Sequence, residues 1–376
     1  IGRELWRTSP PYTSVQKVAD ICPGGCSSEP GNLAVNGATL FFTANDGKHG
    51  FELWRSEPPY VQATTFLVAD IHSDEGNANP AEITPIGTAI FFRADNGKDG
   101  VELWRSDQPY IGAYQVKDIG PGSDSSTPRE LTRIGWMLFF AAEDDSGVEL
   151  WRSDPPYDGA STKQVVDINT EGSANINWLT PLDLKLFFSA TDGESGQELW
   201  VIDSPYHEAR RVTDILGEAP NSNPNRMYAL GDTLFFTAWI GPSGYELFRS
   251  EPPYEPTTTF LVEDLSDALF GSFPDEKVAI GSTLFFNAEG DDGVELYKST
   301  PGYIPETTDL VMDIVPGADS SYPVELTPIG TTLFFNAYDP RHGFELWKSE
   351  PPYNQLTTQL VFDLVEGDAS SDPYSL

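Results

Sequence analysis

The sequence has little positive charge and little histidine. Of its 376 residues, 22 are Lys or Arg and 58 are Asp or Glu, which gives a formal net charge of −36. Nucleic acids and anionic membrane surfaces are bound through cationic faces, so neither is an expected partner. The histidines do not suggest a shared zinc site, because only His49 and His342 occupy the same point of the repeat described below. The other two are His72 and His207.

Long apolar segments and helical periodicity are also missing. No window reaches 18 consecutive apolar residues, and the chain opens at Ile1-Gly2-Arg3-Glu4 without a charged-then-apolar leader. We therefore expect no membrane insertion and a signal peptide that has already been removed. Apolar residues nowhere keep a 3.6-residue period over three turns, so we expect almost no helix. The 9 Trp, 15 Tyr and 22 Phe nevertheless predict a folded chain, because acidic disordered segments have few aromatic residues.

Catalytic and modification motifs are few. The chain has no G-x-S-x-G nucleophile elbow and no Asn-x-Ser/Thr sequon. Its two cysteines, Cys22 and Cys26, lie four residues apart in the turn-rich stretch DICPGGCSSEP. This spacing favours a local disulfide, with two free thiols as the alternative.

What the sequence does contain is a repeat. The tripeptide Glu-Leu-aromatic occurs eight times at spacings of 47 to 50 residues, which identifies repeated supersecondary units. A Gly precedes each Glu by two residues, and a Tyr follows it by eight, usually after a proline. The eight glutamates are Glu4, Glu52, Glu102, Glu149, Glu198, Glu246, Glu295 and Glu345.

One unit, residues 80–119, shows the expected strands. PAEITPIG predicts an inner strand, and TAIFFRA predicts a second strand buried on both faces. The turn DNGKDG leads to a third strand, VELWRS. The loop DQPYIGA then leads to a fourth, YQVKDI. Four antiparallel strands in about 45 residues are typical of a β-propeller blade.

The unit count predicts an all-β propeller with one incomplete blade. The chain holds eight Glu-Leu-aromatic strands but only seven Phe-Phe strands, hence about seven and a half repeats in one domain over residues 1–376. We favour eight blades, the last completed by residues beyond Leu376 or by another chain. A seven-bladed ring with a spare hairpin is the alternative.

The repeated G-x-E-L-W-[RK]-S, with [LV]-V-x-D-I, S-S-x-P-x-x-L-T-x-I-G and L-F-F-x-A, resembles the ELWxxDGT or hyalin-like repeat family of secreted proteins. Where that family has Asp-Gly-Thr, this chain has Pro-Pro-Tyr or a close variant. The resemblance implies a propeller that is displayed outside the cell and acts by binding.

A second resemblance concerns the tryptophans. Ala44-Asn45-Asp46 through Gly50 to Trp54 is similar to the tryptophan-docking motif of eight-bladed quinoproteins, and related frames cover residues 94–104, 190–200 and 337–347. That likeness implies indoles wedged between neighbouring blades. It does not imply quinone chemistry, because Cys22 and Cys26 are not adjacent.

The Glu-Leu-aromatic strands most simply serve the fold. A carboxylate beside an aromatic on every blade can accept backbone N–H bonds, which a buried carboxylate requires. We assign this structural role to Glu52, Trp54, Glu102, Trp104, Glu149, Trp151, Glu198, Trp200, Glu345 and Trp347. The Asp that ends each fourth strand is expected to bind amides of the following loop.

Two sets of residues are candidates for binding. Tyrosines in proline-stiffened loops present rings that stack on sugars, unless each ring fills the crevice between blades. They are Tyr12, Tyr60, Tyr110, Tyr157, Tyr206, Tyr254, Tyr303 and Tyr353. Acidic turns suit Ca²⁺, unless they are plain solvated hairpins. Their aspartates are Asp46, Asp95, Asp144, Asp192 and Asp291.

Together these features predict a secreted, non-catalytic propeller. Its expected partners are carbohydrate, matrix or cell-surface proteins, bound through the loops at the blade rims. A structural component of a cell wall, sheath or appendage is the second hypothesis. A glycosidase-type or quinoprotein-like enzyme is the third, since two carboxylates at a suitable separation cannot be sorted from 58 acidic residues by sequence alone.

Overall fold

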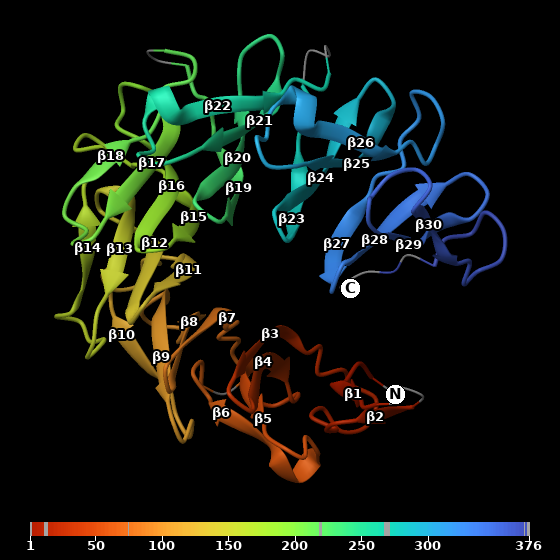
Figure 1. The fold of residues 1–376 in the computed structure, drawn as a ribbon. Helices are drawn as coiled ribbons and strands as arrows, with labels where there is room; N and C mark the ends of the chain where they lie inside the picture. Colours follow the sequence, from red (N-terminus) through yellow and green to blue (C-terminus); the bar gives the residue numbers. More distant parts are fainter. Residues whose placement is uncertain are drawn as a thin grey trace. The chain divides into compact units, whose positions relative to one another are not determined.

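The computed structural model describes residues 2–10, 14–73, 75–217, 220–266, 271–371 and 373, which form mainly β-strands (Figure 1). The helices in these segments are single 3₁₀ turns: η1 (Gln62–Thr64), η2 (Pro256–Thr258) and η3 (Pro305–Thr307). The expectation of almost no helix is therefore confirmed. No helix in the described part of the chain has the length and apolarity needed to cross a membrane.

Consecutive strands pair into antiparallel sheets. In the described residues, seven sheets have four strands each, and one has the two strands β1 (Trp6–Thr8) and β2 (Val15–Lys17). This confirms the predicted seven whole units and a half unit. Each four-stranded sheet has the architecture of a propeller blade.

The first four complete sheets are formed by these strands: β3 (Gly31–Asn36), β4 (Thr39–Asn45), β5 (Phe51–Ser56), β6 (Thr65–Ala69); β7 (Ala81–Ile86), β8 (Ala89–Asp95), β9 (Val101–Asp107), β10 (Tyr114–Lys117); β11 (Arg129–Ile134), β12 (Met137–Asp144), β13 (Gly147–Ser153), β14 (Thr162–Val166); β15 (Asn177–Leu182), β16 (Lys185–Thr191), β17 (Gln197–Asp203), β18 (Ala209–Arg211).

The remaining three sheets are formed by these strands: β19 (Asn225–Leu230), β20 (Thr233–Trp239), β21 (Tyr245–Ser250), β22 (Thr259–Glu263); β23 (Asp275–Ile280), β24 (Thr283–Gly290), β25 (Gly293–Ser299), β26 (Thr308–Met312); β27 (Val324–Ile329), β28 (Thr332–Asp339), β29 (Gly343–Ser349), β30 (Thr358–Phe362).

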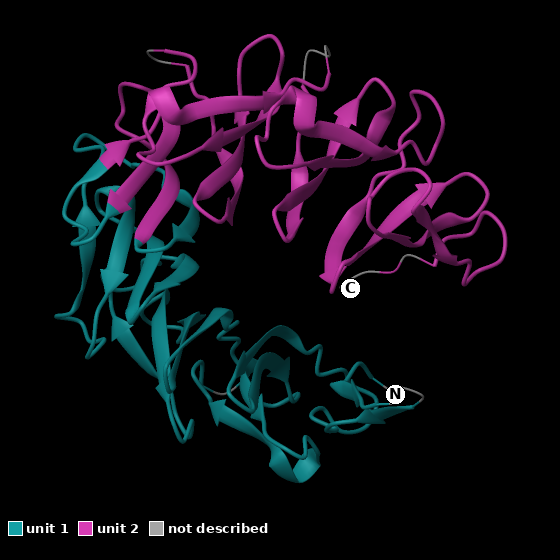
Figure 2. Cartoon of the chain, in the orientation of Figure 1, with its two compact units in different colours: residues 1–184, 203–209 teal, residues 185–202, 210–376 magenta. Residues whose placement is uncertain are grey.

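The chain divides into two compact units, drawn in different colours in Figure 2. Unit 1 comprises residues 1–184 and 203–209, and unit 2 comprises residues 185–202 and 210–376. The single domain expected over residues 1–376 stays a prediction.

The second strand of each four-stranded sheet carries the Phe-Phe pair, and both rings are buried in every pair except that of β28, where Phe334 is half-buried. In β12, Phe139 and Phe140 have no exposed surface. Strand β12 pairs with β13 so that Phe140 faces Trp151 and Ala142 faces Glu149. The unbroken apolar run therefore marks a strand covered on both faces, as expected from the sequence.

Left-handed backbone recurs at fixed points of the repeat. The first strand has a register shift near its start in six of the four-stranded sheets. In β11, Glu130 lies at this shift and has φ 55°. Sterics explain why a Gly precedes the Glu-Leu-aromatic tripeptide. Gly100, for example, has φ 70°, and a Cβ at this position would lie 2.6 Å from the carbonyl oxygen of Asp124. Only glycine fits this close approach.

The hydrophobic core lies between successive sheets. In unit 1, Phe91 and Leu103 of one sheet form a cluster with Phe140, Trp151 and Tyr157 that belong to the next. Unit 2 repeats the arrangement, with Phe235 and Leu247 against Phe286 and Tyr297. Packing against a neighbouring sheet therefore buries the apolar residues of each sheet in these clusters.

We expect Phe140→Ala to lower the free energy of unfolding by about 3–5 kcal/mol, because it leaves a cavity in this core. Leu356→Ala is the matched control, since that side chain is 93% exposed, and it should change little. Urea denaturation followed by tryptophan fluorescence measures both. Equal effects of the two substitutions would contradict the inter-sheet core.

Candidate functional site

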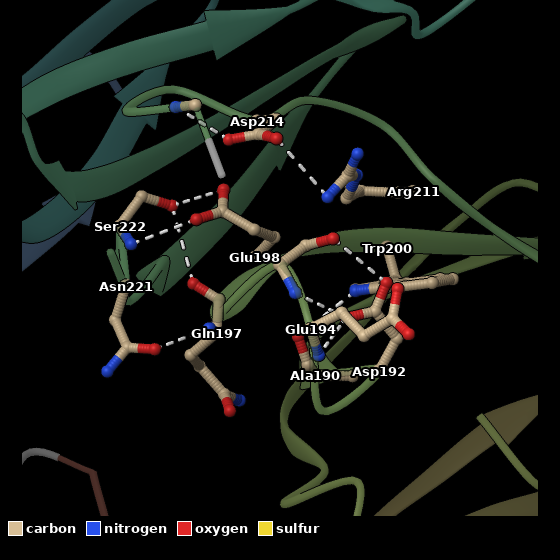
Figure 3. A network of polar contacts seen from close by, with 12 residues as sticks. Ala190, Asp192, Glu194, Gln197, Glu198, Trp200, Arg211, Asp214, Asn221 and Ser222 are labelled. Carbon is tan, nitrogen blue, oxygen red and sulfur yellow. Dashed lines mark hydrogen bonds and ion pairs between the residues drawn. The ribbon is translucent and has the colours of Figure 1, made fainter. Parts of the chain in front are cut away.

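A buried glutamate joins each third strand to the loop that leads to the next sheet. Figure 3 shows Glu198, which begins β17 and has no exposed surface. The backbone N–H of Ser222 donates to its Oε1 at 3.0 Å, and the Ser222 hydroxyl donates to its Oε2 at 2.6 Å. Beside it, the N–H of Gln197 donates to Oδ1 of Asn221 at 2.7 Å. We call the glutamate and its loop donors the glutamate clamp.

The clamp is fullest at Glu102. Its two carboxylate oxygens accept backbone N–H bonds from Ile119, Gly120 and Ser126 at 2.9, 3.1 and 3.0 Å, and the Ser126 hydroxyl at 2.6 Å. Donors from the equivalent loop also bind Glu4, Glu52, Glu149, Glu246, Glu295 and Glu345. The carboxylates thus accept the N–H bonds that the sequence led us to expect.

Burial raises the pKa of six of these carboxyls, and the N–H donors oppose the rise. The pKa reaches about 7 at Glu52, Glu149, Glu198, Glu246 and Glu295. At Glu102 the pKa is also raised. The five carboxyls with a pKa of about 7 exchange protons near neutral pH, although they are fully buried and leave no room for a substrate.

The tryptophans beside the glutamates pack in the core. Trp104 belongs to the cluster of Phe41, and Trp151 to that of Phe91. Trp347 and Trp54 occupy equivalent clusters. Trp200 is half-buried and donates its indole N–H to the carbonyl of Ala190 at 3.0 Å (Figure 3).

The loop tyrosines lie against the preceding sheet. The ring of Tyr157 meets Phe91 edge-on at 4.9 Å between centroids, and its hydroxyl donates to the carbonyl of Trp136 at 2.5 Å. Edge-on contacts of the same kind pair Phe41–Tyr110, Phe139–Tyr206, Phe187–Tyr254, Phe235–Tyr303 and Phe285–Tyr353. Tyr12 lies outside the described residues.

These contacts agree with the alternative prediction, in which each tyrosine ring fills the crevice between neighbouring blades. Tyr110, Tyr157, Tyr206 and Tyr254 are less than a tenth exposed. Tyr60 makes the hydroxyl bond, to the carbonyl of Ala38 at 2.9 Å, but lacks a Phe contact among the described residues. Ligand binding by the tyrosines stays a prediction.

The acidic turns bind their own backbone. Asp192 accepts the N–H groups of Glu194 and Ser195, and these bonds lower its pKa although burial works to raise it. Asp46, Asp95 and Asp144 bind amides of their turns in the same way, and Asp291 is exposed. No three His, Cys, Asp or Glu side chains among the described residues gather to hold a metal ion, and the calcium site stays a prediction.

Two of these turns carry an Asp–His pair that the sequence reasoning missed. His49 Nδ1 lies 2.8 Å from Asp46 Oδ2, and His342 Nδ1 lies 2.6 Å from Asp339 Oδ2. The shared spacing Asp-x-x-His was the available signal. Such a pair orients an imidazole in hydrolases, but in the described segments no serine hydroxyl is bonded to either ring.

A buried lysine was also missed. Lys277 in β23 stands where the other first strands carry Leu, Ile or Met, and it is 9% exposed. Its Nζ donates to Thr237 Oγ1 at 2.9 Å and to the carbonyl of Pro274 at 2.8 Å. Burial lowers its pKa to about 7.

The predicted disulfide between Cys22 and Cys26 is confirmed, with Cα atoms 5.6 Å apart.

Comparison with known proteins identifies the fold. No protein-family model matches the chain, and no curated protein matches it in sequence. A structure from a study of two prolyl endopeptidases is 14% identical to this chain, with a TM-score of 0.53. The match covers 88% of this chain and 49% of the endopeptidase chain. Oligopeptidase B from Leishmania major is 10% identical, with a TM-score of 0.54 over 90% of this chain and 49% of its own.

The chain therefore spans about half the length of these solved structures. At such low identity the likeness shows the fold alone. It confirms an all-β propeller of four-stranded antiparallel blades, since the matched part of these enzymes is their propeller.

The predicted function is corrected by the same finding. We predicted a non-catalytic carbohydrate-binding or adhesion protein, with an assembly component and a glycosidase-type or quinoprotein-like enzyme as alternatives. These predictions were wrong, because the structural neighbours are serine peptidases. The same neighbours contradict the prediction that the protein is not an enzyme, although only the propeller part of them is matched. One fold hosts many chemistries, so a blade pattern does not select the activity.

The raised pKa values predict how stability depends on pH. Five clamp carboxyls, those of Glu52, Glu149, Glu198, Glu246 and Glu295, have a pKa of about 7 in the folded chain, against an ordinary 4.5. Between these values the folded chain holds protons that the unfolded chain has lost. Stability contributed by this protonation is present at low pH and lost as pH rises through about 7.

Unfolding at pH 6 should thus release protons, and Glu198→Gln should reduce the release by about one proton. Calorimetry in buffers of different ionisation enthalpy measures it. Net proton uptake on unfolding at pH 6 would be incompatible with the raised pKa values.

The Tyr–Phe contact predicts a graded loss of stability. Tyr157→Phe removes only the hydroxyl bond and should lower the free energy of unfolding by about 1 kcal/mol. Tyr157→Ala should lower it by about 3–5 kcal/mol. Tyr60→Ala is the matched control without a Phe partner, and its loss should be smaller by about 0.5–1.5 kcal/mol. Urea denaturation tests the series, which fails if Tyr60→Ala costs as much as Tyr157→Ala.

Proposed function

We propose that this chain is the propeller module of a peptidase-type enzyme and works beside a catalytic component. The observation that carries the proposal is the fold likeness to a prolyl endopeptidase and to oligopeptidase B, over 88% and 90% of this chain. Only 49% of each of those proteins is matched. If this chain is one module of a larger enzyme, most of it should match those proteins while only about half of each of them is matched.

The chain's own residues favour a role that assists catalysis by another component. Two Asp–His pairs are present, but neither imidazole has a bonded hydroxyl in the described part of the chain. The catalytic component would therefore supply the nucleophile. In the two prolyl endopeptidases, inter-domain dynamics are described as having a role in catalysis and specificity. We propose the corresponding role for this module, which would set the specificity of its catalytic component.

The charge suggests the class of substrate. A net charge of −36 produces a negative field that speeds the approach of cationic ligands and slows that of anionic ones. We therefore propose that cationic oligopeptides are preferred, with a preference that salt weakens.

We also propose that the protein is secreted and belongs with the ELWxxDGT repeat proteins. The Cys22–Cys26 disulfide supports the location, because disulfides persist mainly in oxidising compartments. The repeat pattern supports the relationship.

The native protein tests this function. An antibody raised against the recombinant 376-residue chain would purify the native polypeptide or complex, which is then treated with a fluorophosphonate probe and fluorogenic oligopeptides. We expect a labelled serine and hydrolysis of cationic peptides at least about tenfold faster at low salt than at high salt. The recombinant chain alone is the control and should show neither labelling nor hydrolysis.

Native material without labelling or hydrolysis would refute the peptidase proposal. Labelling and hydrolysis by the isolated chain would instead refute the need for a separate catalytic component.

A further inference from the structure

Strand β1 has an unpaired edge. The tripeptide Glu4-Leu5-Trp6 makes β1 the equivalent of a third strand. A complete third strand pairs on both sides, as β13 does with β12 and β14. Within the described residues, β1 pairs with β2 alone. In this part of the structure its other edge has no strand partner, and the backbone N–H and C=O groups of such an edge readily pair with a further strand.

The core beside β1 lacks one side chain. The cluster between the sheets of β3–β6 and β7–β10 has ten buried residues, which include Phe41, Leu53, Val68, Ile90, Phe92, Ala94, Trp104 and Tyr110. Next to β1 the same positions are held by Leu5, Val18, Leu40, Phe42, Ala44, Trp54 and Tyr60. The position without a counterpart is that of Phe41, the first Phe of a Phe-Phe strand.

The side chains around the missing Phe are more exposed than their equivalents in complete sheets, because no Phe-Phe strand covers them. Leu33 in β3 is 56% exposed, whereas Leu131 and Leu179 at the same point of their strands are 9% and 8% exposed. Leu40 is only half-buried, whereas its equivalent Leu138 is fully buried. Tyr60 is the tyrosine without a Phe contact.

These residues line an open groove of about 360 Å³. Its lining includes Leu5, Trp6, Val18, Leu33, Leu40 and Tyr60. The lining is mainly apolar and lies along the free edge of β1. A groove that combines apolar pockets with an unpaired strand is suited to β-augmentation, in which backbone bonds give affinity and alternate side chains give specificity.

We propose that this groove binds a β-hairpin of the repeat's own inner type, donated by a polypeptide segment outside these 376 residues. The hairpin's second strand pairs with β1, and the first Phe of its Phe-Phe pair fills the position between Leu40 and Tyr60. Its first strand covers Leu33. This inference is independent of the peptidase proposal.

A second copy of the chain is a less suitable donor. Its Leu-Phe-Phe strands each lie between two paired strands, as β12 lies between β11 and β13. Donating one would open a complete sheet with its two buried rings, and burial of those rings contributes several kcal/mol. A separate hairpin carries no such cost.

The probe is a fluorescein-labelled peptide with the sequence of residues 81–95, AEITPIGTAIFFRAD, which contains the strands of β7 and β8. We expect saturable binding to the 376-residue chain by fluorescence polarisation. We also expect the peptide to slow hydrogen exchange at the amides of β1, residues 6–8. Replacing the peptide residue that corresponds to Phe91 by Asp should weaken binding at least about tenfold, because it removes the aromatic anchor.

Variants of the chain separate the groove from the rest of the surface. Leu33→Lys should weaken binding, and it should leave folding intact because the side chain is already exposed. Leu356→Lys, at a site that is 93% exposed and outside the groove, should leave binding unchanged.

Three results would overturn the proposal. The first is the absence of saturable binding. The second is binding that neither the peptide substitution nor Leu33→Lys affects. The third is a concentration-dependent dimer that protects β1 without peptide, which would make a second copy the occupant.

Discussion

The arrangement of the sheets depends on a buried carboxylate. Where the chain leaves one sheet and enters the next, several backbone N–H groups are buried and have no strand to pair with. Glu102 accepts three of them and a serine hydroxyl. Without the carboxylate these donors would be unsatisfied, and each such group costs about 1–3 kcal/mol. The clamp therefore holds the start of each third strand against the loop that begins the next sheet.

Once the loop is held, the aromatic residues complete the contact. The Phe-Phe strand of one sheet faces the Trp and Tyr of the next, as Phe91 faces Trp151 and Tyr157. The tyrosine hydroxyl then binds the first hairpin turn of its own sheet. Most of the repeated aromatic residues are consequently used in packing, so the residues that distinguish this repeat contribute mainly to stability. Function is left to surfaces that the repeat does not define.

The half sheet shows what this dependence implies. Strand β1 retains its clamp at Glu4 and much of its core, but the missing inner strands leave Leu33 exposed and Tyr60 without its Phe. In a complete blade the equivalent positions are covered, as Leu131 and Leu138 are. An incomplete blade therefore becomes a binding surface, and its specificity follows from the side chain that is missing.

The sequence by itself determined the strands, their order and the number of units, because period-2 runs, Phe-Phe pairs and Gly/Pro turns are local features with a direct backbone meaning. It also favoured the short disulfide that the structure shows, since residues 22 and 26 are close in any compact turn. Only the tertiary structure decided which donors bind Glu198, that Tyr157 lies between sheets, and that Lys277 is buried. These features depend on contacts between residues 20 to 70 positions apart, and composition and spacing contain no information about such distances. The likeness to the propellers of peptidases also became visible only in the fold, because at 10–14% identity the fold is shared while the sequence pattern is not.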